Sequence, residues 1–482
     1  MKNIFAQEVV MKNGELSSQR RAILKHGVEL TLHHLTEEKI ESHKREIDRL
    51  IMSRTSQKAL LSFVASIIFE ATDGTIRVPH YAQQDDRASV IWVYDGMRWG
   101  DLPDAQLFID MLRDACRKME LWENYCNDNN FGKKLRKQVE YMLSGYTRRP
   151  DQEDVVLVNF LNGTLEISRD GKHHLRPHCR EDYLRHVLPY QYDPDAKCPR
   201  FQRFLDEVLP DKDAQTIILE YIAFCFVPSL NIEKVLALLG SGSNGKSVLL
   251  HVITQLFGRA NVANENIYDL THDEVHRANI EGKLANICTE NSGKIRSDAF
   301  KTLASREPIS CKWLYAHPYT MTDYARLLFS FNSMPKIDSS FATMRRWLPI
   351  KFEARISDDQ ADPELAEKLV QELPGILNLV LGVLPGLLER KKFSRCAAVE
   401  KTIQELMFCN DPVQQFVVER CEPCTELHKG SELYRAFRVF CDQNNYTRLS
   451  NQEFYHKLGE KYESGSLDHQ KAFCLRVARY ED

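Results

Sequence analysis

The segment 240–247 constrains this chain more than any other part of it. Its residues, GSGSNGKS, fit the pattern G-x-x-x-x-G-K-[S/T], in which glycines let backbone N–H groups curl around phosphate oxygens. The apolar run Val235–Leu239 before it predicts a buried strand, and an apolar stripe at helical spacing after it predicts a helix. We therefore expect a phosphate-binding loop, with Lys246 on the β- and γ-phosphates of ATP and Ser247 on Mg²⁺. The expected nucleotide ligands are Gly240, Ser241, Gly242, Ser243, Asn244, Gly245, Lys246, Ser247 and Val248.

Two apolar runs downstream, 284–288 and 327–331, predict further buried strands. Strands that alternate with helices are typical of a parallel α/β core. The first run leads to Glu290, and we expect it beside the P-loop strand, where the carboxylate can polarise the attacking water or hold the water shell of the metal. The second ends at Asn332, whose amide can orient that water or sense the γ-phosphate. An exposed strand-end glutamate and a turn asparagine are the plainer alternatives.

Arg345 and Arg346 follow Asn332 by 13 and 14 residues. An arginine that stabilises the charge of phosphoryl transfer often comes from a neighbouring subunit. We expect Arg346 to act in this way, with Arg345 as its support. A solvated pair at the edge of the core is the alternative.

The order of these motifs resembles that of the superfamily 3 helicases, which are ring-forming AAA+ motors of DNA viruses, phages and plasmids. It is most similar to the phage/plasmid and poxvirus primase–helicase type. The resemblance covers about residues 60–480 and rests on 240–247, the strand before Glu290, 300–303, 312–318, 331–335 and 345–350, with 96–99, 162–163 and 190–194 upstream and 411–482 downstream. It implies an ATP- and Mg²⁺-dependent helicase that acts as a homo-oligomer, expected to be a hexamer, on single-stranded or forked DNA in the replication of a mobile element.

Two features depart from the family pattern. Residues 1–54 show no paired-carboxylate primase motif, so the resemblance brings no primase activity with it, and a separate primase becomes an expected partner. Thr289 stands where a typical member has aspartate. The metal would then depend on Ser247, Glu290, the phosphates and water.

The resemblance also implies a hairpin that points into the channel of the ring. Residues 309–314 and 318–321 would flank its tip, and the expected DNA contacts are Lys301, Lys312, Tyr315 and His317. A cation contacts phosphate whatever the base sequence, and an aromatic ring stacks on a base. We expect Trp313 to be a packing residue. An ordinary hairpin with a surface histidine is the alternative.

The expected organisation is an α/β P-loop AAA+ core with an N-terminal α+β domain and a C-terminal winged-helix module. The predicted units are a helical leader (1–54), the α+β domain (55–190), a linker with a helical collar (191–230), the motor (231–390) and the winged helix (400–482). In the last unit Ser450 and Glu453 predict a capping box. Its expected basic wing comprises Lys471, Arg476 and Arg479, for DNA or a partner protein, and a role in capping the ring is the alternative.

Cysteine usage and composition set further limits. Cys421, Cys424 and His428 have metal-like spacing that Cys441 or His456 could complete, but no second C-x-x-C pair is present, so we favour buried thiols over zinc. The 13 scattered cysteines, and the lack of an apolar run in residues 1–12, predict a reducing, cytoplasmic setting. The uncharged stretch 373–388 is broken by prolines and glycines, which favours a buried helical pair over a membrane span.

The net charge of -4 across 482 residues shows no bulk basicity, so any nucleic-acid site must be a local patch or a channel. Two other functions remain. A AAA+ ATPase could load or remodel a nucleoprotein complex without unwinding, and a phosphotransferase would need a basic lid that the sequence lacks. The choice between DNA and RNA stays open.

Overall fold

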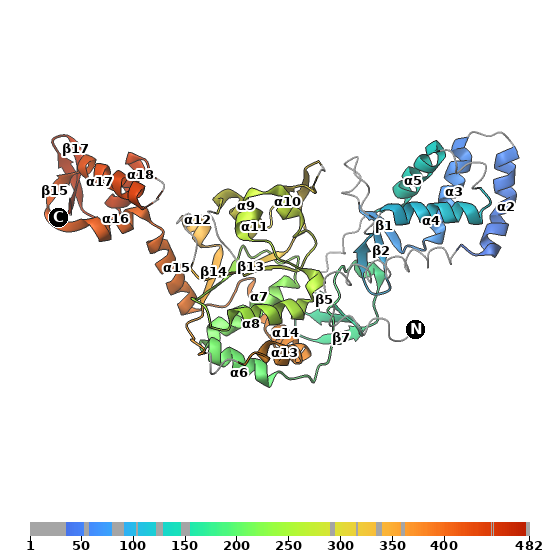
Figure 1. The fold of residues 1–482 in the computed structure, drawn as a ribbon, viewed down its shortest axis with the longest axis horizontal. Helices are drawn as coiled ribbons and strands as arrows, with labels where there is room; N and C mark the ends of the chain where they lie inside the picture. Colours follow the sequence, from blue (N-terminus) through green and yellow to red (C-terminus); the bar gives the residue numbers. More distant parts are fainter. Residues whose placement is uncertain are drawn as a thin grey trace.

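The computed structural model describes residues 35–52, 57–79, 91–102, 105–121, 129–145, 155–289, 295–314, 317–333, 340–357, 362–444, 446 and 448–478. Their apolar side chains gather in four buried clusters. Two of these clusters lie on the two faces of a central sheet, one lies in an N-terminal helical unit and one in a C-terminal unit (Figure 1).

The centre is a five-stranded, fully parallel sheet in the order β14-β8-β13-β10-β9. Its strands are β8 (Val235–Leu239), β9 (Val262–Ala263), β10 (Ala285–Cys288), β13 (Arg326–Phe331) and β14 (Trp347–Lys351). Parallel sheets are covered on both faces, which explains the continuous apolar runs seen in the sequence. One prediction is wrong: β13 lies between β8 and β10, so the strand that leads to Glu290 is not beside the P-loop strand.

Alternate residues of β8 face opposite layers of helices. Leu236 and Leu238 belong to one cluster, whereas Val235, Ala237 and Leu239 belong to the other. The first layer contains α6 (Pro199–Val208), α7 (Lys212–Cys225), α8 (Lys246–Phe257), α13 (Leu365–Val370) and α14 (Leu373–Arg390). The second contains α9 (Ile267–His272), α10 (Glu274–Ala278), α11 (Ser297–Ser305), α12 (Phe341–Met344) and the antiparallel hairpin of β11 (Ile309–Cys311) and β12 (Tyr319–Met321).

Within the described residues, α14 alone is long and apolar enough to cross a membrane, by length and composition only. Eight of its residues are buried in the first helical layer, and the carboxylate of Glu220 on α7 binds both Arg390 and the backbone N–H of Ser394. The sequence predicted a helical pair within 373–388, but Pro385 lies inside one continuous helix.

The N-terminal unit packs four helices against a small sheet of order β3-β2-β1-β4. The helices are α2 (Glu37–Met52), α3 (Gln57–Ala71), α4 (Ala105–Lys118) and α5 (Asn129–Leu143), and the strands are β1 (Ile76–Pro79), β2 (Trp92–Tyr94), β3 (Trp99–Asp101) and β4 (Ser144–Gly145). The part of the predicted leader before residue 35 lies outside the described residues.

A second antiparallel sheet joins this unit to the centre. It comprises β5 (Val155–Phe160), β6 (Gly163–Ser168) and β7 (His173–Arg176), and the apolar side chains on one face of it belong to the same cluster as α6, α7 and α8. Phe160 pairs with Gly163, so Leu161 and Asn162 form the turn between β5 and β6. Gly163 has φ +147°, and a Cβ there would lie 2.5 Å from the carbonyl oxygen of Arg176, so this position requires glycine.

The C-terminal unit follows α15 (Ala397–Cys409), which links it to the centre (Figure 1). Its elements are α16 (Pro412–Arg420), β15 (Cys421–Lys429), α17 (Gly430–Gln443), α18 (Asn451–Gly459), β16 (Ser464–Leu467) and β17 (Gln470–Val477). The predicted capping box of Ser450 and Glu453 is present at the start of α18.

Candidate nucleotide site

The loop 240–247 joins the carboxyl end of β8 to the first residue of α8, as its sequence predicted. Gly242, Ser243 and Gly245 all have positive φ, at +105°, +47° and +82°. A Cβ on Gly245 would lie 2.6 Å from Cγ1 of Val208, so the loop has no room for a side chain there. The strained, close-packed backbone at the amino end of a 12-residue helix is the arrangement that presents N–H groups to phosphate.

The side chain of Lys246 is held in place by hydrogen bonds to residues of the loop itself. Its Nζ donates to the carbonyl of Gly240 at 2.6 Å and to Oδ1 of Asn244 at 2.9 Å. Asn244 in turn donates to the carbonyl of Phe352 at 3.3 Å. Burial lowers the pKa of Lys246 from its ordinary value. The ammonium is therefore prepositioned in a polar pocket, while Ser247 on the next position is exposed and available to a metal ion.

The segment after β14 lies against the loop, a contact that no local pattern in the sequence predicts. The backbone N–H of Ile356 donates to the carbonyl of Ser243 at 2.9 Å, and that of Phe352 donates to Leu239 at 2.7 Å. Glu353 and Arg355 are exposed within this segment. Two charged side chains thus lie near the P-loop of the same chain.

Asn332 directly follows β13, the strand beside the P-loop strand β8. The backbone N–H of Gly240 donates to the carbonyl of Phe331 at 3.1 Å, so the residue that follows β13 begins beside the loop, and its side chain is exposed. Glu290 lies outside the described residues, and the described chain stops at the exposed Thr289 at the end of β10.

Arg345 and Arg346 precede the amino end of β14, whereas the loop follows the carboxyl end of the neighbouring parallel strand β8. The carbonyl of Arg346 accepts from Val235, the first residue of β8, at 2.8 Å. Arg346 is buried, and its guanidinium donates to Oγ of Ser305 at 3.0 Å and to the carbonyl of Ala342 at 2.6 Å. The side chain of Arg345 is 47% exposed and pairs with Glu233 at 2.6 Å. The exposed arginine is therefore Arg345, not the Arg346 that the sequence favoured.

The predicted hairpin is present as β11 and β12, and the residues that follow β11 differ from expectation. Trp313 and Leu314 are 45% and 65% exposed, so the prediction that Trp313 packs in the interior is wrong. Lys312 is half-buried and His317 exposed, whereas Tyr315 lies outside the described residues and Lys301 lies on a different element, α11. The base of the hairpin is fixed to α10, because Lys312 N donates to the carbonyl of Glu274 at 3.1 Å and Arg277 donates to that of Ser310 at 3.0 Å.

The described residues contain no group of three His, Cys, Asp or Glu side chains that could hold a metal ion. Cys421, Cys424 and His428 lie along one strand, β15, while Cys441 is buried in the C-terminal cluster and His456 is exposed. Nor is any described cysteine in a disulfide.

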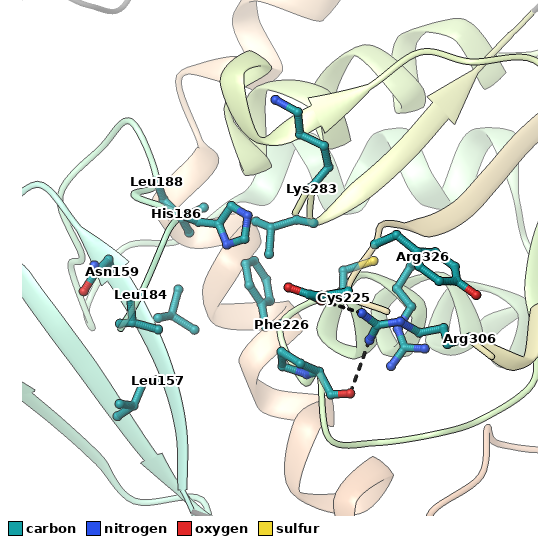
Figure 2. A pocket seen from close by; sticks show the side chains of 15 residues that line it. Leu157, Asn159, Leu184, His186, Leu188, Cys225, Phe226, Lys283, Arg306 and Arg326 are labelled. Atoms are coloured by element: carbon teal, nitrogen blue, oxygen red, sulfur yellow. Dashed lines mark hydrogen bonds and ion pairs between the residues drawn. The ribbon is translucent and has the colours of Figure 1, made fainter. Parts of the chain in front are cut away.

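A cavity of about 80 Å³ lies where β5 and residues 184–188 meet the central unit (Figure 2). The basic side chains that line it already form hydrogen bonds or ion pairs with other residues of the chain. Arg326 donates to the carbonyl of Leu230 at 2.5 Å, Arg306 binds Asp323 at 2.8 Å, and His186 donates to the carbonyl of Gly282 at 2.8 Å. Burial lowers the pKa of His186 to about 4. A volume of this size holds a few waters, so the cavity is a joint between units and not a nucleotide site.

Comparisons with known proteins bear on three stretches of the chain. Residues 82–210 match a family described as D5 N terminal like, and residues 409–476 match one described as Poxvirus D5 protein-like. The chain is similar to D5-type primase–helicases. The resemblance seen in the sequence is thereby confirmed. Between the two D5 matches, residues 238–346 match a family of unknown function, DUF5906.

The chain is also similar to a curated protein named "Putative helicase L207/L206", from Acanthamoeba polyphaga mimivirus. It is 23% identical over 333 residues, which is 61% of this chain but 34% of the relative, so the chain spans about a third of that protein. Two solved structures of the NrS-1 C-terminal region are 9% identical, with TM-scores of 0.48 and 0.46. They cover 84% and 87% of this chain, and the matches span 97% and 99% of theirs.

Proposed function

We propose that this chain is an ATP-driven DNA helicase of the superfamily 3 type, with a AAA+ core, that acts as a ring in the replication of a mobile element or virus. The observation that carries the proposal is the placement of Lys246. It lies in a glycine-wrapped loop at the carboxyl edge of a five-stranded parallel sheet, between two stretches similar to D5 proteins.

Each part of the ATP site has a stated role in this proposal. The loop N–H groups and Lys246 bind the β- and γ-phosphates, and Ser247 holds Mg²⁺, which offsets the phosphate charge. Glu290 accepts a proton from the attacking water, and Asn332, beside Gly240, orients that water.

The arginine of the catalytic centre comes from the next subunit. β14 separates Arg345 from the loop of its own chain by the length of five residues, about 17 Å. Its side chain is 47% exposed and, among the described residues, forms an ion pair only with the partly exposed Glu233, so it can reach a nucleotide on another copy, whereas Arg346 is fixed by Ser305 and Ala342. The acting residue in our proposal is thus Arg345, with Arg346 as the internal anchor.

In this proposal DNA in the channel contacts the residues that connect β11 to β12. Trp313 offers a large exposed ring for base stacking, next to the cation Lys312 and close in sequence to His317. Tyr315 keeps its predicted role.

The C-terminal unit is a winged helix in this proposal. Its order of helix, strand, helix, helix, strand, strand from α16 to β17 supports that reading. Two of its predicted wing cations have neighbours in the chain, however. Arg476 pairs with Glu422 at 2.9 Å, and Lys471 lies 5.6 Å from the ring centre of Phe473. Arg479 lies outside the described residues. The charge of the wing therefore supports DNA contact less than its fold does.

The test compares the full chain with Lys246→Ala and with Lys392→Ala, an exposed lysine away from the loop. The wild type and the control should hydrolyse ATP and displace a strand from forked DNA, and Lys246→Ala should do neither. Hydrolysis by Lys246→Ala within twofold of wild type contradicts the P-loop assignment. Hydrolysis by the wild type without strand displacement contradicts a helicase and indicates an ATPase that remodels a nucleoprotein complex.

A further inference from the structure

Helix α5 presents a row of lysines on its exposed side. Lys133, Lys134 and Lys137 are all exposed, and Tyr141, four residues after Lys137, is 72% exposed. Residues four apart lie on the same face of a helix, so Lys133, Lys137 and Tyr141 form one line about 12 Å long. The opposite side of the helix is buried in the N-terminal cluster through Phe131, Leu135, Val139 and Leu143.

The three lysines of this face form no ion pair with another described residue, whereas Arg136 on the same helix pairs with Glu140 at 2.6 Å. On the neighbouring α4, both Arg113 and Arg117 pair with aspartates of that helix. α5 itself carries four cations and one carboxylate, in a chain whose net charge is -4.

The row is unfavourable for the helix by itself. Lys133 and Lys137 are like charges four residues apart, an arrangement that destabilises a helix. A polyanion laid along the face removes this repulsion. The exposed tyrosine at the end of the row adds a surface on which a base can stack.

We propose that Lys133, Lys134, Lys137 and Tyr141 form a binding surface for single-stranded nucleic acid outside the motor. The lysines contact successive phosphates without regard to sequence, and the tyrosine stacks on one base. An anionic membrane fits the surface less well, because membrane-bound helices insert an apolar face, and the apolar face of α5 is buried in its own unit. The inference rests on the proposed function for the nature of its ligand, but not on the P-loop.

The experiment measures binding of a fluorescent oligo-dT strand to the full chain over a range of salt concentrations. In the triple variant Lys133→Gln, Lys134→Gln, Lys137→Gln, we expect the slope of log affinity against log salt to fall by about 2, at about 0.7 per phosphate contact, with a loss of affinity of about tenfold or more at 0.1 M salt. The matched control, Lys392→Gln, Arg395→Gln, Lys401→Gln, removes the same charge from exposed positions elsewhere and should bind like wild type.

Tyr141→Ser separates stacking from charge. It should lower the affinity about fivefold or more and leave the salt slope unchanged. Basal ATPase should be unchanged in all three variants, and circular dichroism should show intact helix, because glutamine and lysine have similar helix propensities.

Three results overturn the inference. The first is a triple variant that binds oligo-dT like wild type, and the second is a control whose salt slope falls equally. The third is lysine-dependent binding to phosphatidylserine vesicles while oligo-dT binding is unaffected. Failure of the proposed motor function is seen separately, as ATP hydrolysis by Lys246→Ala.

Discussion

The position of Arg345 makes a quantitative prediction about mixed rings. Arg345 and the loop that contains Lys246 lie beyond opposite ends of β14, a strand about 17 Å long. An arginine side chain is too short to span this distance within one chain. Arg345→Ala alone should lower the rate of ATP hydrolysis about 10³-fold or more and leave ATP binding in place. Lys246→Ala should also be inactive.

Mixing the two inactive variants in equal amounts should restore activity. A productive interface needs the intact loop of an Arg345→Ala subunit to face the intact arginine of a Lys246→Ala subunit. With random assembly and independent sites, about one interface in four meets this condition, so about a quarter of the wild-type ATPase should return.

The assay is steady-state phosphate release after subunit exchange, with exchange followed by energy transfer between labelled subunits. Arg395→Ala, which removes an arginine whose side chain is 93% exposed on another surface, should keep full activity by itself. If exchange is complete and the mixture remains inactive, the arginine does not act between subunits. Wild-type hydrolysis by Arg345→Ala alone would equally refute the role.

Three further predictions test the loop, the hairpin and the joint. Gly245→Ala should weaken binding of a fluorescent ATP analogue, because φ is +82° and the new Cβ would meet Val208, whereas Gly382→Ala, with no atom within 4 Å, should bind like wild type; equal affinities contradict the close packing. Trp313→Ala should reduce DNA affinity about fivefold or more in equilibrium binding and leave basal ATPase intact, and unchanged affinity removes the ring from the DNA path. Burial holds the pKa of His186 at about 4, below its ordinary 6.5, so the unfolded chain takes up a proton first as pH falls. Stability should therefore drop by about 1 kcal/mol at pH 5.5 and about 3 kcal/mol below pH 4 in urea titrations, and His186→Gln should flatten that part of the profile; an unchanged profile refutes the assignment.

The strands and helices around the P-loop could be predicted because their signals are local. A continuous apolar run marks β8, and an apolar stripe of helical period marks α8, so both were placed without knowledge of the rest of the chain. The order of strands could not be predicted in the same way. β13, which follows β10 along the chain, lies between β8 and β10, and strand order is a property of the whole sheet that no single segment of sequence specifies.

The choice between adjacent residues was the least predictable part of the site. Arg345 and Arg346 have the same chemistry and adjoining positions, and only the tertiary structure shows that Ser305 on α11 lies within reach of Arg346. The prediction for Trp313 was wrong in the opposite sense, because a residue expected to pack is exposed. Its size and apolarity favour burial, yet its side chain is 45% exposed, and the adjacent Lys312 and its place near the predicted hairpin tip were the available signals.

The contacts of Glu233 explain how the side chain of Arg345 can leave its ion pair at a small cost in free energy. Its carboxylate pairs with Arg345 at 2.6 Å and also with Arg346 at 3.2 Å, and it is only partly exposed. A half-buried carboxylate that loses its sole partner is strongly destabilised, but here Arg346 remains in place, held by Ser305 and Ala342. Movement of Arg345 toward a phosphate on another copy would therefore exchange one anionic partner for another and leave no charge unpaired behind it. In the proposed mechanism the buried arginine and the exposed one therefore have different tasks, and a Glu233→Gln variant should raise the mobility of the Arg345 side chain without loosening that of Arg346.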